Sequence, residues 1–128
     1  MNSKFYVSLE AARLLKEKGY NKEVEMFYND IGVLREVREF FQDWECLSND
    51  RLYNNRLSAP SKAEAIDWLD EKGIIIELSV THDLCHWVFS IYMKGEETIL
   101  HDADFDFEYL QTRLGAEEAA IIKALELL

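Results

Sequence analysis

The sequence predicts an α+β fold, in which an antiparallel β-meander of about three to four strands is packed on one face by N-terminal, central and C-terminal helices. Two observations predict it. Apolar residues recur at helical spacing near both ends of the chain and in the segment after Pro60. From Ile74 to Met93 the apolar period changes to two, as in half-buried strands.

Length and composition favour one domain spanning residues 1–128. A chain of 128 residues, 48% of them hydrophobic, is long enough to form one core. The polar connection between Leu47 and Ala59 is short and carries apolar anchors, so we interpret it as an ordered loop. No apolar run approaches the roughly 20 residues of a membrane span. The N-terminus also lacks the apolar core of a signal peptide. We expect a cytoplasmic protein, with Cys46 and Cys85 as buried thiols.

The first helix is expected to begin after Ser8, whose hydroxyl caps it, and to end at Gly19. Alternation over Val24–Tyr28 then indicates a short strand. Two interpretations stay open for Val33–Leu47. Its apolar residues have the spacing of an amphipathic helix, but Val33–Val37 could instead pair back on the strand as a hairpin. The helical stripe would consist of Leu34, Val37, Phe41 and Trp44.

The central helix is predicted from about Lys62 to Lys72. Ser61 and Glu64 form an S-x-x-E capping box, and Gly73 supplies the left-handed end. Its buried stripe is expected to be Ala63, Ile66, Trp68 and Leu69, opposed by Glu64, Asp67, Asp70 and Glu71.

A β-hairpin follows this helix. Burying both apolar faces together requires even-numbered residues of Ile74–Val80 to oppose odd-numbered residues of the next strand. We favour a four-residue loop, Thr81–Leu84, which places Val80 opposite Cys85 and therefore Leu78 opposite Trp87.

A turn at Lys94 and Gly95 is expected to lead into a third strand, Glu96–Asp102. The corresponding register places Phe89 opposite Leu100 and Val88 opposite His101. The C-terminal segment is expected to form one kinked helix or two short ones, interrupted at Gly115 and started by Asp104 or Asp106. The apolar residues of these helices are Phe107, Leu110, Leu114, Ala119, Ile122, Leu125 and Leu128.

The predicted register gathers polar side chains on the outer face of the sheet. Ser79 opposes His86, Glu77 lies on the same face, and His101 is diagonal to His86. Such a cluster would suit a small enzyme or a ligand- or metal-binding protein. A half-solvated sheet face produces similar clusters without any function, however, because its residues alternate. Cys85 and His86 would point to opposite faces, so they do not form a nucleophilic pair.

Recognisable catalytic or metal-binding motifs are absent. The sequence has no phosphate-binding glycine loop, no CxxC pair, no HExxH and no GxSxG. Asp102, Asp104 and Asp106 match the start of a calcium loop, but Phe107 and Arg113 occupy positions that require Gly and Glu. We therefore assign no catalytic residue, metal ligand or cofactor.

The net charge of −11 is the strongest compositional feature. The segment from Glu96 to Leu128 holds nine acids and two bases. Such a surface repels phosphate, so direct nucleic-acid binding is not expected, whereas a basic protein would be attracted. The candidate partner-binding acids are Asp102, Asp104, Asp106 and Glu108.

These observations favour a non-enzymatic protein-interaction module. In a sharper version of this hypothesis, the acids mimic a DNA backbone and occupy a nucleic-acid-binding protein. Two other classes remain. One is the enzyme or ligand binder built around His86, and the other is a homo-oligomer joined through the edge strand at Val24 or Ile74.

Two stretches of the sequence carry a resemblance to a known family. One is Tyr53-Asn54-Asn55 with Leu57-Ser58-Ala59-Pro60-Ser61, followed by Ala65, Trp68 and Leu69. The other is Ser8-Leu9-Glu10-Ala11-Ala12 with Leu14 to Gly19. Both resemble a family of small uncharacterised proteins found in Bacteroides-type gut bacteria and their phages or mobile elements. The resemblance implies an accessory protein of phage or mobile-element origin. It transfers no functional residue, because the shared motifs are structural.

Overall fold

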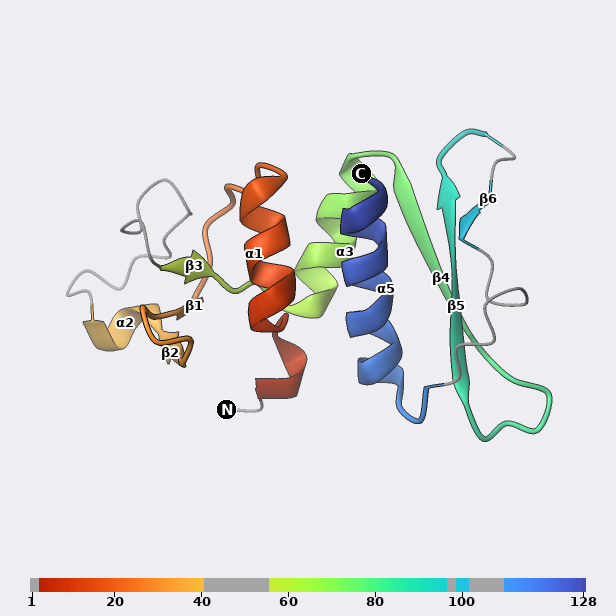
Figure 1. The fold of residues 1–128 in the computed structure, drawn as a ribbon, viewed down its shortest axis with the longest axis horizontal. Helices are drawn as coiled ribbons and strands as arrows, with labels where there is room; N and C mark the ends of the chain where they lie inside the picture. The colour runs from red at the N-terminus through yellow and green to blue at the C-terminus, as the bar shows by residue number, and fades with distance from the viewer. Residues whose placement is uncertain (1–2, 41–55, 97–98, 102–109) are drawn as a thin grey trace. The chain divides into compact units, whose positions relative to one another are not determined.

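The computed structural model describes residues 3–40, 56–96, 99–101 and 110–128, and these residues form an α+β protein (Figure 1). The predicted fold class is therefore confirmed. The chain divides into two compact units, Met1–Ser61 and Lys62–Leu128, and each contains an antiparallel three-stranded sheet. A single domain over residues 1–128 stays a prediction.

The first unit begins with a short 3-10 helix, η1 (Ser3–Phe5), and helix α1 (Leu9–Glu17). The predicted cap is present, since the Ser8 hydroxyl accepts a hydrogen bond from the Ala11 N–H at 3.1 Å. The helix ends before Gly19, whose φ of +92° favours glycine. The buried residues of α1 are Ala11, Ala12 and Leu15.

The sheet of the first unit has β1 (Met26–Tyr28) at its centre, between β2 (Leu34–Glu36) and β3 (Leu57–Ser58). β1 pairs antiparallel with both neighbours. The hairpin interpretation of the segment after β1 is therefore confirmed. Helix α2 (Val37–Phe40) begins only after this hairpin, so a helix starting at Leu34 is wrong.

Asn29 explains why the chain reverses before Leu34. Its side-chain oxygen accepts hydrogen bonds from the N–H groups of Ile31 and Val33, at 3.1 and 2.9 Å. Gly32 adopts a φ of +80° within the same turn. An Asn side chain that satisfies two backbone donors favours a tight turn over a helix.

The second unit begins with helix α3 (Lys62–Glu71), close to the predicted range, and Gly73 follows it with a φ of +88°. Its buried face matches the prediction at Trp68 and Leu69 but differs from it nearer the start of the helix. Ala65 is buried and Ala63 is exposed, because the stripe starts one position earlier, at Lys62. The stem of Lys62 is buried, and its Nζ donates to the Leu114 carbonyl at 3.2 Å. The buried residues of α3 are Lys62, Ala65, Trp68 and Leu69.

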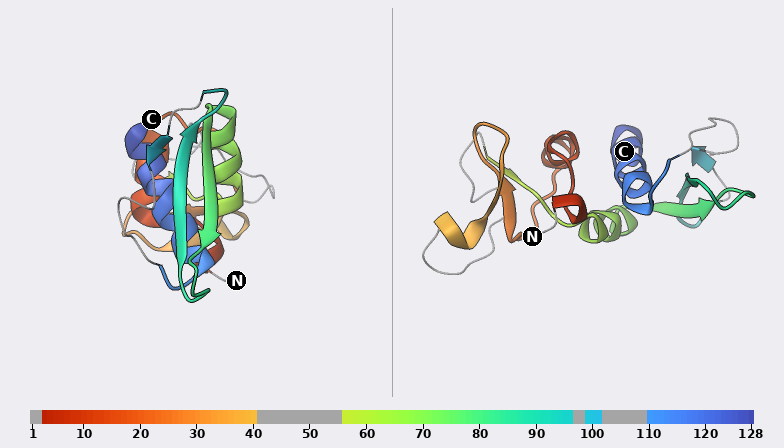
Figure 2. Two further views of the ribbon diagram at one scale, coloured as in Figure 1. Left: turned by 90° about the vertical axis from the view of Figure 1, so that its right-hand side faces the viewer. Right: turned by 90° about the horizontal axis from the view of Figure 1, so that it is seen from below.

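The second sheet has the order β4 (Ile74–Val80), β5 (Trp87–Met93) and β6 (Ile99–His101). Its inner face packs against α3 and the C-terminal helix, and its outer face is turned away from both (Figure 2, left). Even-numbered residues of β4 oppose odd-numbered residues of β5, as predicted. The preferred register is wrong by two residues, because Val80 opposes Trp87 and not Cys85.

The hairpin loop accounts for this shift. The loop has the expected four residues, but they are His82–Cys85. It is closed by hydrogen bonds from the Thr81 N–H to the His86 carbonyl at 3.0 Å and from the Leu84 N–H to the Thr81 carbonyl at 2.9 Å. The Asp83 carboxylate accepts from the Cys85 N–H inside the loop. These local bonds, which the apolar pattern does not reveal, set the register.

The pairing of β5 with β6 also differs from the prediction. His101 opposes Ile91, and an irregularity follows between Ile91 and Tyr92. The expected pairing of His101 with Val88 is therefore wrong, and so is the remaining predicted pair, Phe89 with Leu100. An irregularity of this kind inserts a residue into one strand and changes which face the next side chain occupies.

Helix α5 (Arg113–Leu127) is continuous, so the expected break at Gly115 is wrong. The Thr112 hydroxyl accepts a hydrogen bond from the Gly115 N–H at 3.0 Å and caps the helix, which places Gly115 in its first turn. Leu110 does not lie in this helix, since it forms a β-bridge with Trp87. The predicted cap at Asp104 or Asp106, and Phe107, lie outside the described residues.

The buried side of α5 matches the prediction at Leu125 but differs from it at the other residues expected in this segment. Ala119 and Ile122 are only half-buried, and Leu128 is exposed. The helix instead packs through alanines four residues apart, so its backbone lies close to β4, β5 and α3. The buried residues of α5 are Ala116, Ala120, Ile121, Ala124 and Leu125.

Candidate functional site

Two of the four predicted cluster residues lie together on the outer face of the second sheet. Glu77 and Ser79 are exposed on β4, opposite Ser90 and Val88 of β5. They share this face with the apolar Ile75, which is 37% exposed. The outer face thus mixes polar and apolar side chains, and Ile75, Glu77 and Ser79 on it are exposed.

His86 lies at the base of the hairpin loop. Its carbonyl accepts from the Thr81 N–H, so the residue opposes Thr81 and not Ser79. Its Nδ1 is 3.8 Å from a carboxylate oxygen of Asp83, a distance that suits an ion pair when the imidazole is protonated. A carboxylate partner of His86 therefore lies in its own loop.

His101 belongs to the other side of the sheet. It is 6% exposed, and its ring stacks on that of Phe89 with centroids 4.8 Å apart and planes 15° apart. Phe89 is a buried residue of the inner face. The expected position of His101 diagonal to His86 is therefore wrong, and the four residues Glu77, Ser79, His86 and His101 do not converge.

The hairpin tip carries the remaining titratable side chains of this region. Asp83 accepts hydrogen bonds from the Thr81 hydroxyl and from the Cys85 N–H. These bonds, with a smaller contribution from His86, hold the pKa of the Asp83 carboxyl below its ordinary value of 3.8. Leu84 adopts a φ of +58° in the same loop. Asp83 therefore stabilises the turn through hydrogen bonds to residues of the same hairpin.

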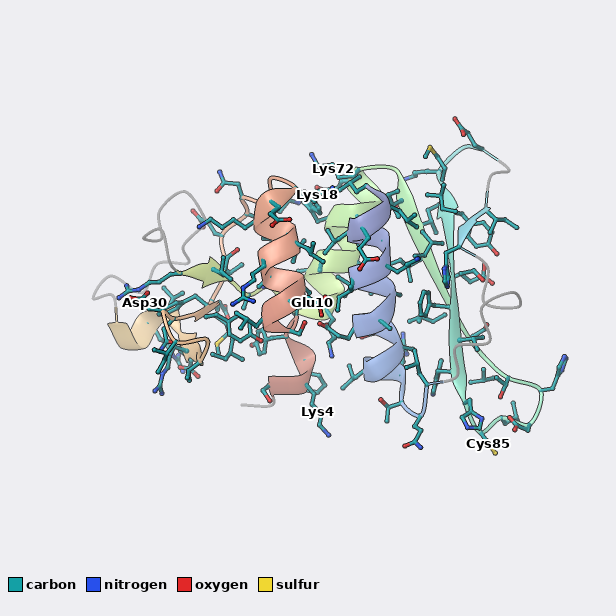
Figure 3. All side chains as sticks on the ribbon, viewed as in Figure 1. Lys4, Glu10, Lys18, Asp30, Lys72 and Cys85 are labelled. Atoms are coloured by element: carbon teal, nitrogen blue, oxygen red, sulfur yellow. The ribbon has the colours of Figure 1, made fainter. Side chains whose placement is uncertain are left out.

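Cys85 is exposed at this tip, where Figure 3 shows it at the far end of the hairpin. The expectation of a buried thiol is wrong for this cysteine, and Cys46 lies outside the described residues. The argument against a Cys85–His86 pair also loses its premise, because Cys85 lies in the loop and not on a strand. Its Sγ instead approaches the Asp83 carbonyl at 3.4 Å.

Across the described ranges, no three His, Cys, Asp or Glu side chains gather as a metal site would require.

Negative charge is concentrated in the second unit. Residues 62–128 contain fifteen acids and five bases, a net charge of −10, whereas residues 1–61 contain ten acids and nine bases, a net charge of −1. The candidate acids Asp102, Asp104, Asp106 and Glu108 lie outside the described residues. Exposed acids that the structure does place in this unit include Glu64, Asp67, Asp70, Glu71, Glu77, Asp83 and Glu96.

The acids of α3 form one exposed side of that helix. Their spacing of three and four residues places successive carboxylates on the same side. One of them is engaged locally, since the Asp70 carboxylate pairs with the Lys94 Nζ at 3.1 Å. The sequence had pointed to the C-terminal quarter alone and had missed this contribution. Counting charge by structural unit would have found it.

Comparison with known proteins gives no relative. Neither a family model, nor a curated protein, nor a solved structure matches this chain. None of the described helices is both long enough and apolar enough to cross a membrane.

Proposed function

We propose that the protein is a non-enzymatic interaction module whose second unit, Lys62–Leu128, binds a basic protein partner. The observation that carries this proposal is the segregation of charge, with −10 of the total −11 in one unit. A protein that is acidic only for solubility does not need this asymmetry, since spreading the charge would serve equally well. The field of a unit with one dominant sign steers partners of the opposite sign.

The alternative function, an enzyme or ligand binder around His86, has less support. It requires the side chains of Glu77, Ser79, His86 and His101 to converge, and His101 stacks on the inner face instead.

The DNA-mimic version of the interaction hypothesis has less support as well. The placed acids lie on α3, on β4, in the hairpin tip and on α5, and not in a single line. A basic protein partner makes no such demand on spacing. The mobile-element origin implied by the resemblance is compatible with this role and remains part of the proposal.

The test is affinity capture from a lysate of the source organism, with elution at stepwise salt. A triple variant, Glu64→Gln with Asp67→Asn and Glu71→Gln, removes three exposed charges from α3 and leaves the Asp70–Lys94 pair intact. The matched control, Glu10→Gln with Glu17→Gln and Glu23→Gln, removes three exposed charges from the first unit.

We expect a basic protein to elute at moderate salt, and its recovery to fall several-fold with the α3 variant but not with the control. Equal losses in both variants would show that only total charge matters. Capture of nothing from a lysate with demonstrably intact complexes would contradict the proposal outright.

A further inference from the structure

Strand β4 is an edge of the second sheet. The strand order is β4-β5-β6, so among the residues that the structure describes β4 has a strand on one side only. The other edge of the sheet differs, because β6 has three residues and an irregular register, and Leu110 bridges to β5 beside it. β4 has seven residues in regular pairing with β5. Among the described strands of this sheet, it therefore offers the longer regular edge.

The residues of β4 that form hydrogen bonds with β5 alternate with residues whose backbone groups point away from β5, and two of the bonds show which are which. The Thr81 N–H donates to the His86 carbonyl, and the Lys94 N–H donates to the Gly73 carbonyl. Both bonds join odd-numbered positions of the β4 side to even-numbered positions of the β5 side. In an antiparallel pair such positions alternate, so the even-numbered residues of β4 direct their N–H and C=O groups to the open edge. These residues are Ile74, Ile76, Leu78 and Val80.

The hydrogen bonds of Trp87 independently confirm this alternation. Its N–H and its carbonyl both form hydrogen bonds with Leu110, on the side of β5 opposite β4. The N–H and C=O groups of odd-numbered β5 residues therefore point away from β4, as the alternation along the hairpin requires.

The residues of β4 themselves supply little of the protection that proteins usually give to edge strands. It has no proline, its register with β5 is regular, and Glu77 is its only charged residue. Burial decreases along the strand: Ile74 is buried, Ile76 and Leu78 are half-buried, and Val80 is 43% exposed. The accessible part therefore runs from Ile76 to Val80.

Charge indicates what would occupy this edge. Glu77 is exposed on the outer face of β4, and α3, which packs against β4, carries exposed acids. A second copy of the chain would bring another unit of charge −10 to the same place, which like-charge repulsion disfavours. A segment with Lys or Arg on alternate residues would instead meet opposite charge across the strand pair.

We propose that β4 binds an extended, basic segment of a protein partner as an added antiparallel or parallel strand. The main-chain groups of Ile76, Leu78 and Val80 would supply the hydrogen bonds, and Glu77 with the acids of α3 would select basic side chains. The basic character of the partner rests on the proposed function, whereas the use of the β4 edge does not.

The experiment is amide hydrogen exchange by NMR on the full chain, with and without a synthetic nine-residue peptide of alternating Lys and Thr. We expect the amides of Ile76, Leu78 and Val80 to exchange at least tenfold more slowly at saturating peptide. The amides of Glu77 and Ser79, which face β5, should be slow in both states and serve as internal controls.

Two further peptides separate charge from strand addition. One has Glu in place of Lys, and the other keeps every Lys but has Pro at two Thr positions, which prevents it from forming a strand ladder. We expect neither to protect the outward amides.

A pair of variants tests the same edge from the protein side. Val80→Pro removes an outward N–H that takes no part in the β4–β5 ladder, so the fold should tolerate it. We expect at least fivefold weaker binding of the Lys-Thr peptide. Val80→Thr keeps the N–H and should bind as the wild type does.

The possible failures are distinguishable. If the proline-containing peptide binds as well as the Lys-Thr peptide and no outward amide is protected, strand addition is wrong and a basic partner stands. If the Glu peptide protects these amides equally well, the basic partner is wrong. If the amides become protected without peptide as protein concentration rises, a second copy occupies the edge and the proposal is overturned.

Discussion

Asp83 shows how one side chain determines the geometry of the central hairpin. Its carboxylate receives the Thr81 hydroxyl and the Cys85 N–H, so the ionised form is favoured in the folded state. The folded pKa of this group lies below its ordinary value. Ionised Asp83 therefore contributes stability above the unfolded pKa, and this contribution is lost as the pH falls through the folded pKa.

The first prediction concerns the cause of this lowered pKa. The hydrogen bond from Thr81 is its largest contributor, ahead of the Cys85 N–H and of the charge of His86. Thr81→Val should therefore raise the pKa of Asp83 toward 3.8, and His86→Ala should raise it less. NMR titration of the Asp83 carboxyl carbon measures both. A larger rise in His86→Ala would reverse the assigned order of causes.

The second prediction concerns Gly32, which has a φ of +80° and little space for an added Cβ atom. A Cβ atom at Gly32 would lie 3.1 Å from the Leu9 Cδ2 atom. Gly19, in the same unit, has a φ of +92° and nothing within 4 Å of its Cβ position. We expect Gly19→Ala to lower the free energy of unfolding by about 1 kcal/mol, from the backbone alone. Gly32→Ala should cost about 2–3 kcal/mol, because crowding adds to the backbone term.

Urea unfolding followed by circular dichroism measures the difference between these two variants. Equal losses would mean that Leu9 moves aside without cost, and that only the backbone conformation matters at Gly32.

At the scale of elements, α5 illustrates packing through small residues. Ala116, Ala120 and Ala124 recur every four residues and are all fully buried. Their lack of bulk allows the helix backbone to lie close to β4, β5 and α3. Larger apolar side chains would have marked this face more clearly in the sequence. The structure instead uses alanines, which occur on any face of a helix.

The third prediction follows from this packing. Ala120→Leu should destabilise the protein by about 1–3 kcal/mol, because the extra atoms have no space. Ala119→Leu is the matched control, since Ala119 is only half-buried on the same helix and Ala and Leu have similar helix propensities. Thermal unfolding at neutral pH measures both. A neutral or stabilising Ala120→Leu would reveal an unfilled space beside α5.

At the scale of the whole molecule, charge and structure divide at the same place. The boundary between the units follows Ser61, and the second unit holds almost all of the net charge. The same unit contains the long β4 edge. A surface that attracts basic chains and an edge that can hydrogen-bond an extended chain thus occur in one unit, and the two proposals above depend on this coincidence.

The sequence by itself determined the fold class and several element boundaries. Ser8 and Gly19 bracket α1, and Gly73 follows α3, because caps and left-handed glycines act through neighbours a few residues away. The sequence also determined that even-numbered residues of β4 oppose odd-numbered residues of β5. Only this arrangement buries the apolar faces of both strands together. These features are local or are set by the period of two.

Three features were decided only once the three-dimensional structure was known: the strand registers, the choice between helix and hairpin after β1, and whether the residues of the proposed cluster meet. Hydrogen bonds of the Asn29 and Asp83 side chains set two turns, and no apolar pattern reports them. An irregularity in the β5–β6 pairing moved His101 from the expected outer face to a stack on Phe89. A register shift of one residue exchanges the two faces of a strand, so a site built across strands depends on the whole sheet. The sequence therefore named the residues, and long-range pairing decided which of them meet.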